Sequence, residues 1–204
     1  MAKKKNTLPK NFDELITENN IEKLKKVFDT CELNARGGYG KATALSFYNV
    51  PDELVRWLVE NGANLEDVDT YERTALHRHA MARSSKITVF LELGAKVNSL
   101  DKYGNTPLHF AAGSGFNVSS VKDLLAYGAD INALNENNQS PLQKALSSAN
   151  NIDLKHLVEI SQILLQRNTE ITQKMKNEIT RIGENFEFHR ENFNKDYLEE
   201  TMMR

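Results

Sequence analysis

This sequence has very little of what several classes of protein need. It contains one cysteine, Cys31, among 204 residues, so no disulfide can form within the chain and we expect a reducing compartment, the cytoplasm. No apolar run approaches the ~18 residues of a membrane span, and residues 1–9 lack the apolar core of a secretory signal. A net charge of −2 offers no basic face to nucleic acid. We therefore expect a soluble protein with neither a nucleic-acid nor a membrane partner.

Catalytic and metal-binding patterns are scarce as well. No serine, cysteine or carboxylate pair stands at a justified distance from a base, and the glycines of residues 37–41 (GGYGK) lack the spacing of a phosphate loop. His77 and His79 would point about 200° apart on a helix and could not share one metal. We expect no cofactor, no metal and no enzyme activity. The alternative of an enzyme or metal-binding protein that uses His77, His79 and His109 remains open.

What the sequence does contain is a repeat with a period in the low thirties. Its first landmark recurs at residues 43–46 (TALS), 74–77 (TALH), 106–109 (TPLH) and 140–143 (SPLQ). Its second landmark recurs at residues 62–65 (GANL), 94–97 (GAKV), 128–131 (GADI) and, more degenerate, 168–171 (NTEI). A fixed period of this length is typical of stacked helical repeats, which bury a shared core between neighbouring units.

Each landmark has a local physical reason. A threonine or serine hydroxyl caps the free N–H groups at a helix start, and proline suits the first helical turn. Glycine after the second helix permits a left-handed C-terminal cap. A column of branched apolar residues also keeps the same phase, as neighbours buried in a stack would: Leu33, Leu65, Val97, Ile131 and Ile171.

The unit resembles an ankyrin repeat almost position by position. The resemblance is carried by residues 101–112 (DKYGNTPLHFAA) and 128–133 (GADINA), and it extends over residues 11–172. It implies an all-α fold, an ankyrin-repeat solenoid of helix-turn-helix units joined by β-turn or hairpin connections. It also implies structural roles for His77 and His109, whose imidazoles would bond to the backbone near the turns. We interpret His79 as a core substitution.

The repeat phase divides the chain into a disordered basic tail, a repeat domain and a C-terminal helical cap. The expected boundaries are 1–10 for the tail, 11–37, 38–68, 69–100, 101–134 and 135–172 for the units, and 173–204 for the capping extension. Met175, Ile179, Ile182 and Phe186 follow one another at helical spacing in this extension. The cap would cover the open face of the last unit, although its aromatic end could also bind a partner.

The resemblance implies that a partner meets the projecting turns and the first helices. Tyr71 and Tyr103 hold the same turn position, and exposed tyrosines are good contact residues. The alternative is that their rings only stiffen the turns. Carried over residue by residue, the candidate partner-binding set is Tyr39, Phe47, Tyr71, Arg73, Arg78, Met81, Lys102, Tyr103, Asn105, Phe110, Ser114, Asn137 and Lys144.

The sequence thus predicts a non-catalytic module, monomeric alone, that binds another protein through a concave face and turn tips. Some bacterial relatives neutralise toxins, so the resemblance raises the hypothesis of a bacterial immunity protein whose partner is a secreted toxin or effector. A purely structural scaffold is the remaining alternative.

Overall fold

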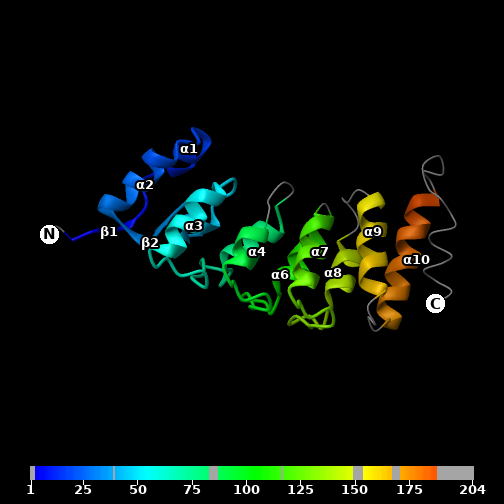
Figure 1. Cartoon of the computed structure of the whole chain (residues 1–204). Helices are drawn as coiled ribbons and strands as arrows, with labels where there is room; N and C mark the ends of the chain where they lie inside the picture. The colour runs from blue at the N-terminus through cyan, green and yellow to red at the C-terminus, as the bar shows by residue number, and fades with distance from the viewer. Residues whose placement is uncertain are drawn as a thin grey trace.

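The computed structural model describes residues 3–38, 40–82, 87–115, 117–148, 154–166 and 171–187. The elements in chain order are β1 (Lys5–Thr7), α1 (Phe12–Thr17), α2 (Ile21–Thr30), β2 (Cys31–Gly37), β3 (Ala42–Thr43), the 3₁₀ helix η1 (Ala44–Ser46), α3 (Asp52–Glu60), α4 (Ala75–Ala80), α5 (Thr88–Glu92), α6 (Pro107–Ser114), α7 (Val118–Ala126), α8 (Pro141–Ser147), α9 (Leu154–Leu165) and α10 (Gln173–Glu187). They follow one another along a row (Figure 1). Within the described ranges, no helix combines the length and apolar composition that crossing a membrane requires.

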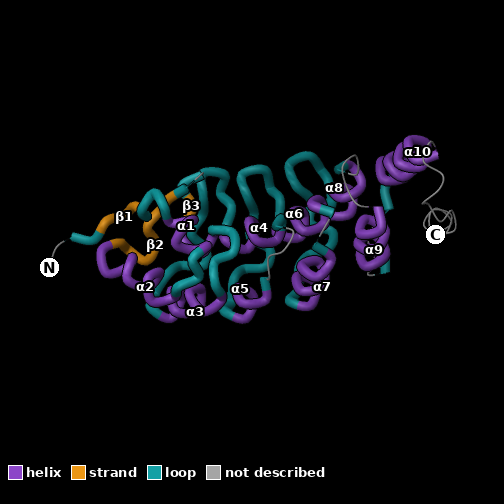
Figure 2. Tube along the Cα trace, turned by 90° about the horizontal axis from the view of Figure 1, so that it is seen from above, coloured by secondary structure: helices purple, strands orange, loops and turns teal. Residues whose placement is uncertain are grey.

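The first helix of each unit begins where the sequence predicts. Thr74 and Thr106 cap α4 and α6, Ser140 caps α8, and prolines occupy the first positions of α6 and α8. Figure 2 shows the result seen from above: the connecting turns lie along one side, α4, α6 and α8 lie next to them, and α3, α5 and α7 lie on the far side. Because these helices are short, their stability comes mainly from packing against neighbouring units.

The second helices α3, α5 and α7 end in the predicted glycine caps. Gly62, Gly94 and Gly128 have φ values of 100°, 88° and 86°, in the region that costs glycine little and other residues more. The alanine after each glycine donates its N–H back to the helix, as in Ala63 N to Leu58 O at 2.9 Å. This bond satisfies a carbonyl that the helix end would otherwise leave free.

The N-terminal end departs from the all-α prediction. A three-stranded sheet has the order β1-β2-β3, with β1 parallel to β2 and β2 antiparallel to β3. The prediction of a disordered tail over 1–10 is therefore wrong for Lys5–Thr7, and Leu8, directly after β1, is buried. The Lys4 ammonium donates to Phe28 O at 2.6 Å. The lysines near the N-terminus had suggested a solvated, disordered tail. Pairing of β1 with β2 and burial of Leu8 hold this segment in place instead.

An aromatic cluster fills the core next to this sheet. Phe12 meets Phe28 and Phe47 edge-on, with ring centroids 6.2 Å and 5.1 Å apart. The prediction that Phe47 faces a partner is wrong, because its side chain is 7% exposed. In this unit the first helix is reduced to η1, and the backbone is extended at Phe47, so the ring turns into the core.

The last described element is α10, which packs against α8. Met175 and Ile182 are buried in the continuous core, and Ile179 is partly buried against it. The aromatic segment 188–194 lies outside the described residues, as does the side chain of Phe186.

The apolar column is only partly buried. Leu33, Leu65, Val97 and Ile131 pack half-buried against the core. Ile171 is 39% exposed, so the expectation of a buried column is wrong at its last member.

The burial of Met175 predicts that α10 stabilises the whole row. We expect Met175→Ala to lower the free energy of unfolding by about 2–5 kcal/mol, since it removes a buried side chain and leaves a cavity. Lys176→Ala, at an exposed position of the same helix, should stay within about 0.5 kcal/mol of wild type. Urea denaturation followed by circular dichroism measures both. Equal stabilities for the two variants would contradict a capping role for α10.

Candidate functional site

The projecting turns are held by one acceptor side chain at the same position of three units. Oδ1 of Asp69, Asp101 and Asn135 each accepts two backbone N–H groups, from the residues two and four positions later, at 2.7–3.1 Å. Side chains of this kind stabilise tight turns by replacing backbone acceptors. The turns are therefore ordered before any partner arrives.

Neighbouring turns are also bonded to each other. The N–H of Lys102 donates to Tyr71 O, and the N–H of Glu136 donates to Tyr103 O, both at 3.0 Å. The tips thus form a continuous row beside the first helices (Figure 2).

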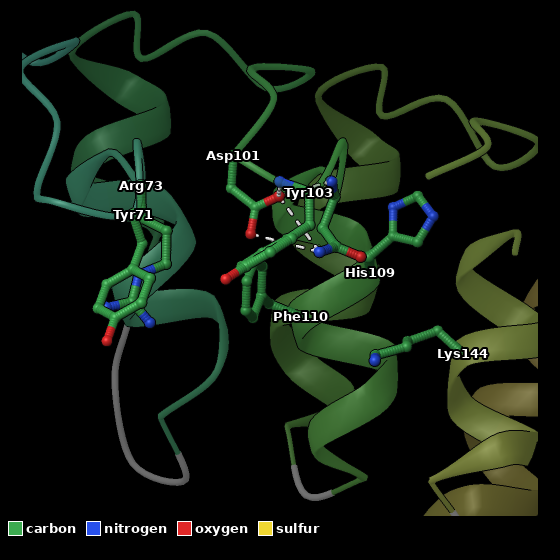
Figure 3. Close-up of a pocket in the computed structure, with 8 residues that line it drawn as sticks. Tyr71, Arg73, Asp101, Tyr103, His109, Phe110 and Lys144 are labelled. Carbon is green, nitrogen blue, oxygen red and sulfur yellow. Dashed lines mark hydrogen bonds between the residues drawn. The ribbon is translucent and has the colours of Figure 1, made fainter. Parts of the chain in front are cut away.

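A pocket of about 300 Å³ lies between the turn of residues 69–73, the turn of residues 101–105 and the helices α6 and α8. Its lining residues are Tyr71, Arg73, Asp101, Tyr103, Asn105, His109, Phe110 and Lys144. All of these except Asp101 and His109 belong to the predicted partner-binding set. The fold brings these six members of the set together from separate units (Figure 3).

The aromatic side chains that line the pocket differ in their exposure and in their contacts with other residues. Tyr103 is 49% exposed. Tyr71 is half-buried, and the Arg73 guanidinium lies 4.6 Å from the centre of its ring. Phe110 meets His77 edge-on at 5.7 Å. Tyr103 therefore offers the largest free aromatic surface, whereas Tyr71 also stiffens its own turn.

The back of the pocket is structural. Asn105 is buried; it donates to Asp101 and accepts from Asn135 Nδ2 at 2.9 Å. The prediction that Asn105 is an exposed tip residue is therefore wrong. Its side-chain amide links two successive turns. The sequence had instead predicted an exposed tip position for Asn105.

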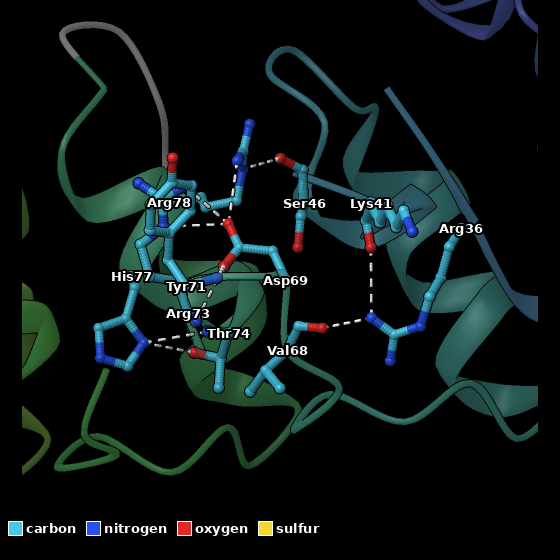
Figure 4. Close-up of polar contacts among 10 residues, drawn as sticks. All are labelled: Arg36, Lys41, Ser46, Val68, Asp69, Tyr71, Arg73, Thr74, His77 and Arg78. Atoms are coloured by element: carbon cyan, nitrogen blue, oxygen red, sulfur yellow. Dashed lines mark hydrogen bonds and ion pairs between the residues drawn. The ribbon is translucent and has the colours of Figure 1, made fainter. Parts of the chain in front are cut away.

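Arg73 and Arg78 converge on a single buried carboxylate. Asp69 Oδ2 accepts from Arg73 Nη2 at 2.7 Å and from Arg78 Nη1 at 3.2 Å (Figure 4). Burial raises the pKa of the Asp69 carboxyl, but the hydrogen bonds from the Arg73 side chain and from the N–H groups of Arg73 and Tyr71 outweigh it, so the pKa is lowered from 3.8. Both predicted contact arginines are thus largely occupied within the protein.

His77 and His109 have the structural role that the resemblance implies. The Thr74 N–H donates to His77 Nδ1 at 3.1 Å, so Nδ1 carries no proton and Nε2 donates to Asn105 O at 3.1 Å. His109 repeats the arrangement between Thr106 and the carbonyl of Gln139. Burial lowers the pKa of both imidazoles. Each histidine therefore joins a helix cap to the next turn in its neutral form.

His79 is buried in the core, as predicted. Its Nε2 donates to Leu45 O at 2.8 Å, and its ring stacks on Phe90 at 4.6 Å. Among the described residues, no group of three or more histidine, cysteine, aspartate or glutamate side chains could hold a metal ion.

The other predicted residues are dispersed. Lys102 and Asn137 are exposed at turn tips, while Met81 and Ser114 are half-buried on or beside the first helices. Tyr39 lies outside the described residues.

Two apolar residues that the sequence reasoning did not select are highly exposed. Leu100 is 59% exposed and Leu134 is 60% exposed. They directly precede Asp101 and Asn135, so they hold one repeat position. The repeat alignment contained this signal.

Comparison with known families agrees with the architecture. A family model described as ankyrin repeats (3 copies) matches residues 41–135 and 79–175. The matched region is more than half of the chain, so this protein belongs to the ankyrin-repeat family.

Two curated relatives share short stretches of this chain. Over 74 residues it is 34% identical to an ankyrin repeat protein of Rickettsia bellii (strain RML369-C), covering 36% of this chain and 31% of that protein. Over 61 residues it is 41% identical to Alpha-latrotoxin-Lg1a of Latrodectus geometricus, covering 28% of this chain and 4% of that protein. The chain thus spans less than a third of either relative, and the likeness concerns the repeats.

The Asp69 cluster predicts a large difference between two equivalent turn residues. Asp69→Asn keeps an acceptor for the turn, as Asn135 does naturally, but leaves the poorly exposed Arg73 and Arg78 without their counter-charge. Asp101→Asn removes no ion pair with any described residue, and the side chain of Asp101 accepts instead from the neutral Asn105. We expect Asp69→Asn to cost about 1–3 kcal/mol more in urea denaturation. Equal losses would show that the ion pairs contribute nothing net.

The buried His79 predicts a loss of stability in acid. Burial lowers the pKa of His79 from 6.5 to about 4, so between these values the unfolded chain binds a proton that the folded chain does not. Its contribution is complete above pH 6.5 and is lost as the pH falls toward 4. His79→Gln can keep a donor for Leu45 O without titrating. From pH 7 to pH 4, wild type should lose about 3 kcal/mol more than this variant; parallel losses would contradict the assignment.

Proposed function

We propose that this protein is an ankyrin-repeat solenoid that binds another protein, without catalysis, through the face formed by its turn tips and first helices. Ankyrin repeats generally mediate protein–protein interaction. The observation that carries the proposal is the pocket between two rigid turns, with the half-exposed Tyr103 at its edge. A rigid surface loses little conformational entropy on docking, so modest contacts can give tight binding.

The histidines favour this proposal over an enzyme or a metal-binding protein. His77, His79 and His109 each donate to a backbone carbonyl from a buried position. A site that needed these imidazoles as ligands or bases would first have to break the bonds that join the units.

A finer proposal is a cytoplasmic immunity protein of a bacterium, which covers a secreted toxin. It rests on the ankyrin resemblance and on the binding face. Co-expression with the products of neighbouring genes tests it: one product should arrest growth alone and lose this effect when the protein is present. If no neighbouring product does so, the toxin role fails while the binding role stands.

The binding face predicts a tyrosine-dependent partner. Wild-type protein, immobilised and exposed to an extract of its native cells, should retain a protein that Tyr103→Ala retains at least tenfold more weakly, because exposed tyrosines often dominate interfaces. Tyr127→Ala is the matched control, since Tyr127 is 46% exposed at the end of the outer helix α7. Quantitative mass spectrometry of the retained proteins provides the measurement. A partner that ignores Tyr103, or that Tyr127→Ala loses equally, would contradict this binding face.

A further inference from the structure

The free charge at the pocket is positive. Asp101 lines the pocket, but its carboxylate is buried and accepts hydrogen bonds from the N–H groups of Tyr103 and Asn105 and from Asn105 Nδ2. The Arg73 guanidinium is paired with Asp69, whose carboxylate also binds Arg78. Lys144 lines the same pocket, and none of the carboxylates in the described residues forms an ion pair with it.

The path of the Lys144 side chain depends on a glycine. Lys144 leaves α8, and Figure 3 shows its ammonium extended toward the aromatic walls from α6 and the turns. A Cβ at Gly113 of α6 would lie 2.9 Å from Lys144 Cγ, closer than two carbon atoms can pack. The missing side chain at Gly113 therefore leaves room for the lysine stem to cross α6.

We propose that this pocket anchors an acidic side chain, aspartate or glutamate, of the protein partner. The carboxylate pairs with the Lys144 ammonium, and its aliphatic part lies against the rings of Tyr103 and Phe110. A partly buried charge-assisted hydrogen bond is stronger than a neutral one, and the aromatic walls limit the water that would compete with it. This inference rests on the proposed function and adds the chemistry of the contact.

The alternative occupant is a basic side chain held by the aromatic rings. Cations do bind over such rings, but here the Tyr71 ring already lies beneath Arg73 and the Lys144 charge would repel a second cation. The distribution of charge therefore favours an acid.

A peptide library tests the proposal without knowledge of the natural partner. A phage-displayed library of random dodecapeptides would be selected for binding to wild-type protein. Peptides that also bind Tyr103→Ala would then be removed, so that only peptides that need the pocket remain. Each selected peptide would be synthesised with its acidic residues intact and with each one replaced by the amide, Asp→Asn or Glu→Gln. Fluorescence anisotropy gives the dissociation constants.

We expect one acid in each peptide whose amide replacement weakens binding to wild type about tenfold and binding to Lys144→Met less than twofold. Methionine keeps a long stem without the charge. Lys122→Met is the control, because Lys122 lies on the outer helix α7 in an ion pair with Glu159; it should behave as wild type. Gly113→Ala should weaken the acidic peptides several-fold although every charge remains, with circular dichroism confirming its fold.

Pocket-directed peptides without such an acid, an undiminished acid effect in Lys144→Met, enrichment of basic residues, or no Tyr103-dependent peptide would each overturn the inference. The proposed function fails separately, if the cellular partner ignores Tyr103→Ala. The two failures are therefore distinguishable.

Discussion

The middle of the row depends on two neutral imidazoles, His77 and His109, each of which joins a helix cap to the next unit. In His77 one ring nitrogen accepts the N–H of Thr74 while the other donates to the carbonyl of Asn105. A single side chain thus satisfies a free donor at a helix start and fixes the position of the following turn. Because buried polar groups cost free energy when unpaired, the helix and the next turn must form together.

The same constraint explains what happens where the histidine is absent. Ser46 stands at this position in the second unit, whose first helix shrinks to the 3₁₀ turn η1. Here two side chains of the third unit form the hydrogen bonds between the second and third units. Arg78 Nε donates to Ser46 O at 3.0 Å, and His79 Nε2 donates to Leu45 O at 2.8 Å. His79, which looks like a tolerated oddity in sequence, therefore replaces the lost bridge.

The fourth copy of the first landmark also lacks the histidine. Gln143 holds the histidine position there, and its buried Nε2 has no hydrogen-bond partner among the described residues. Among the described elements that follow this unit, α10 packs on α8.

The sequence predicted the structure correctly where residues close together in the chain determine it. The threonine caps and the left-handed glycines follow from patterns within a few residues, whereas the resemblance to the repeat family implied the two structural histidines. Prediction failed where distant segments decide the outcome, because no local pattern shows that Lys5–Thr7 pairs with β2 or that Phe47 packs on Phe12.

The candidate site divides along the same line. Tyr71, Tyr103, Phe110 and Lys144, which the resemblance placed in the candidate binding set, line one pocket. The resemblance could not reveal that Asn105 is spent on Asp101 and Asn135, because that depends on side-chain geometry between turns. Exposure is a property of the assembled row and not of the residue type.

The way charge is used inside the turns determines what remains for a partner. Asp69 is consumed by two arginines, and Asp101 by the N–H groups of its own turn. Both side chains hold their turns from buried positions, so neither carboxylate is available at the surface of the pocket. Turns built in this way bury the carboxylates of Asp69 and Asp101 and leave the ammonium of Lys144 uncompensated beside the aromatic rings. Because the turns use these carboxylates, the charge that remains free at the pocket is positive and favours acidic groups.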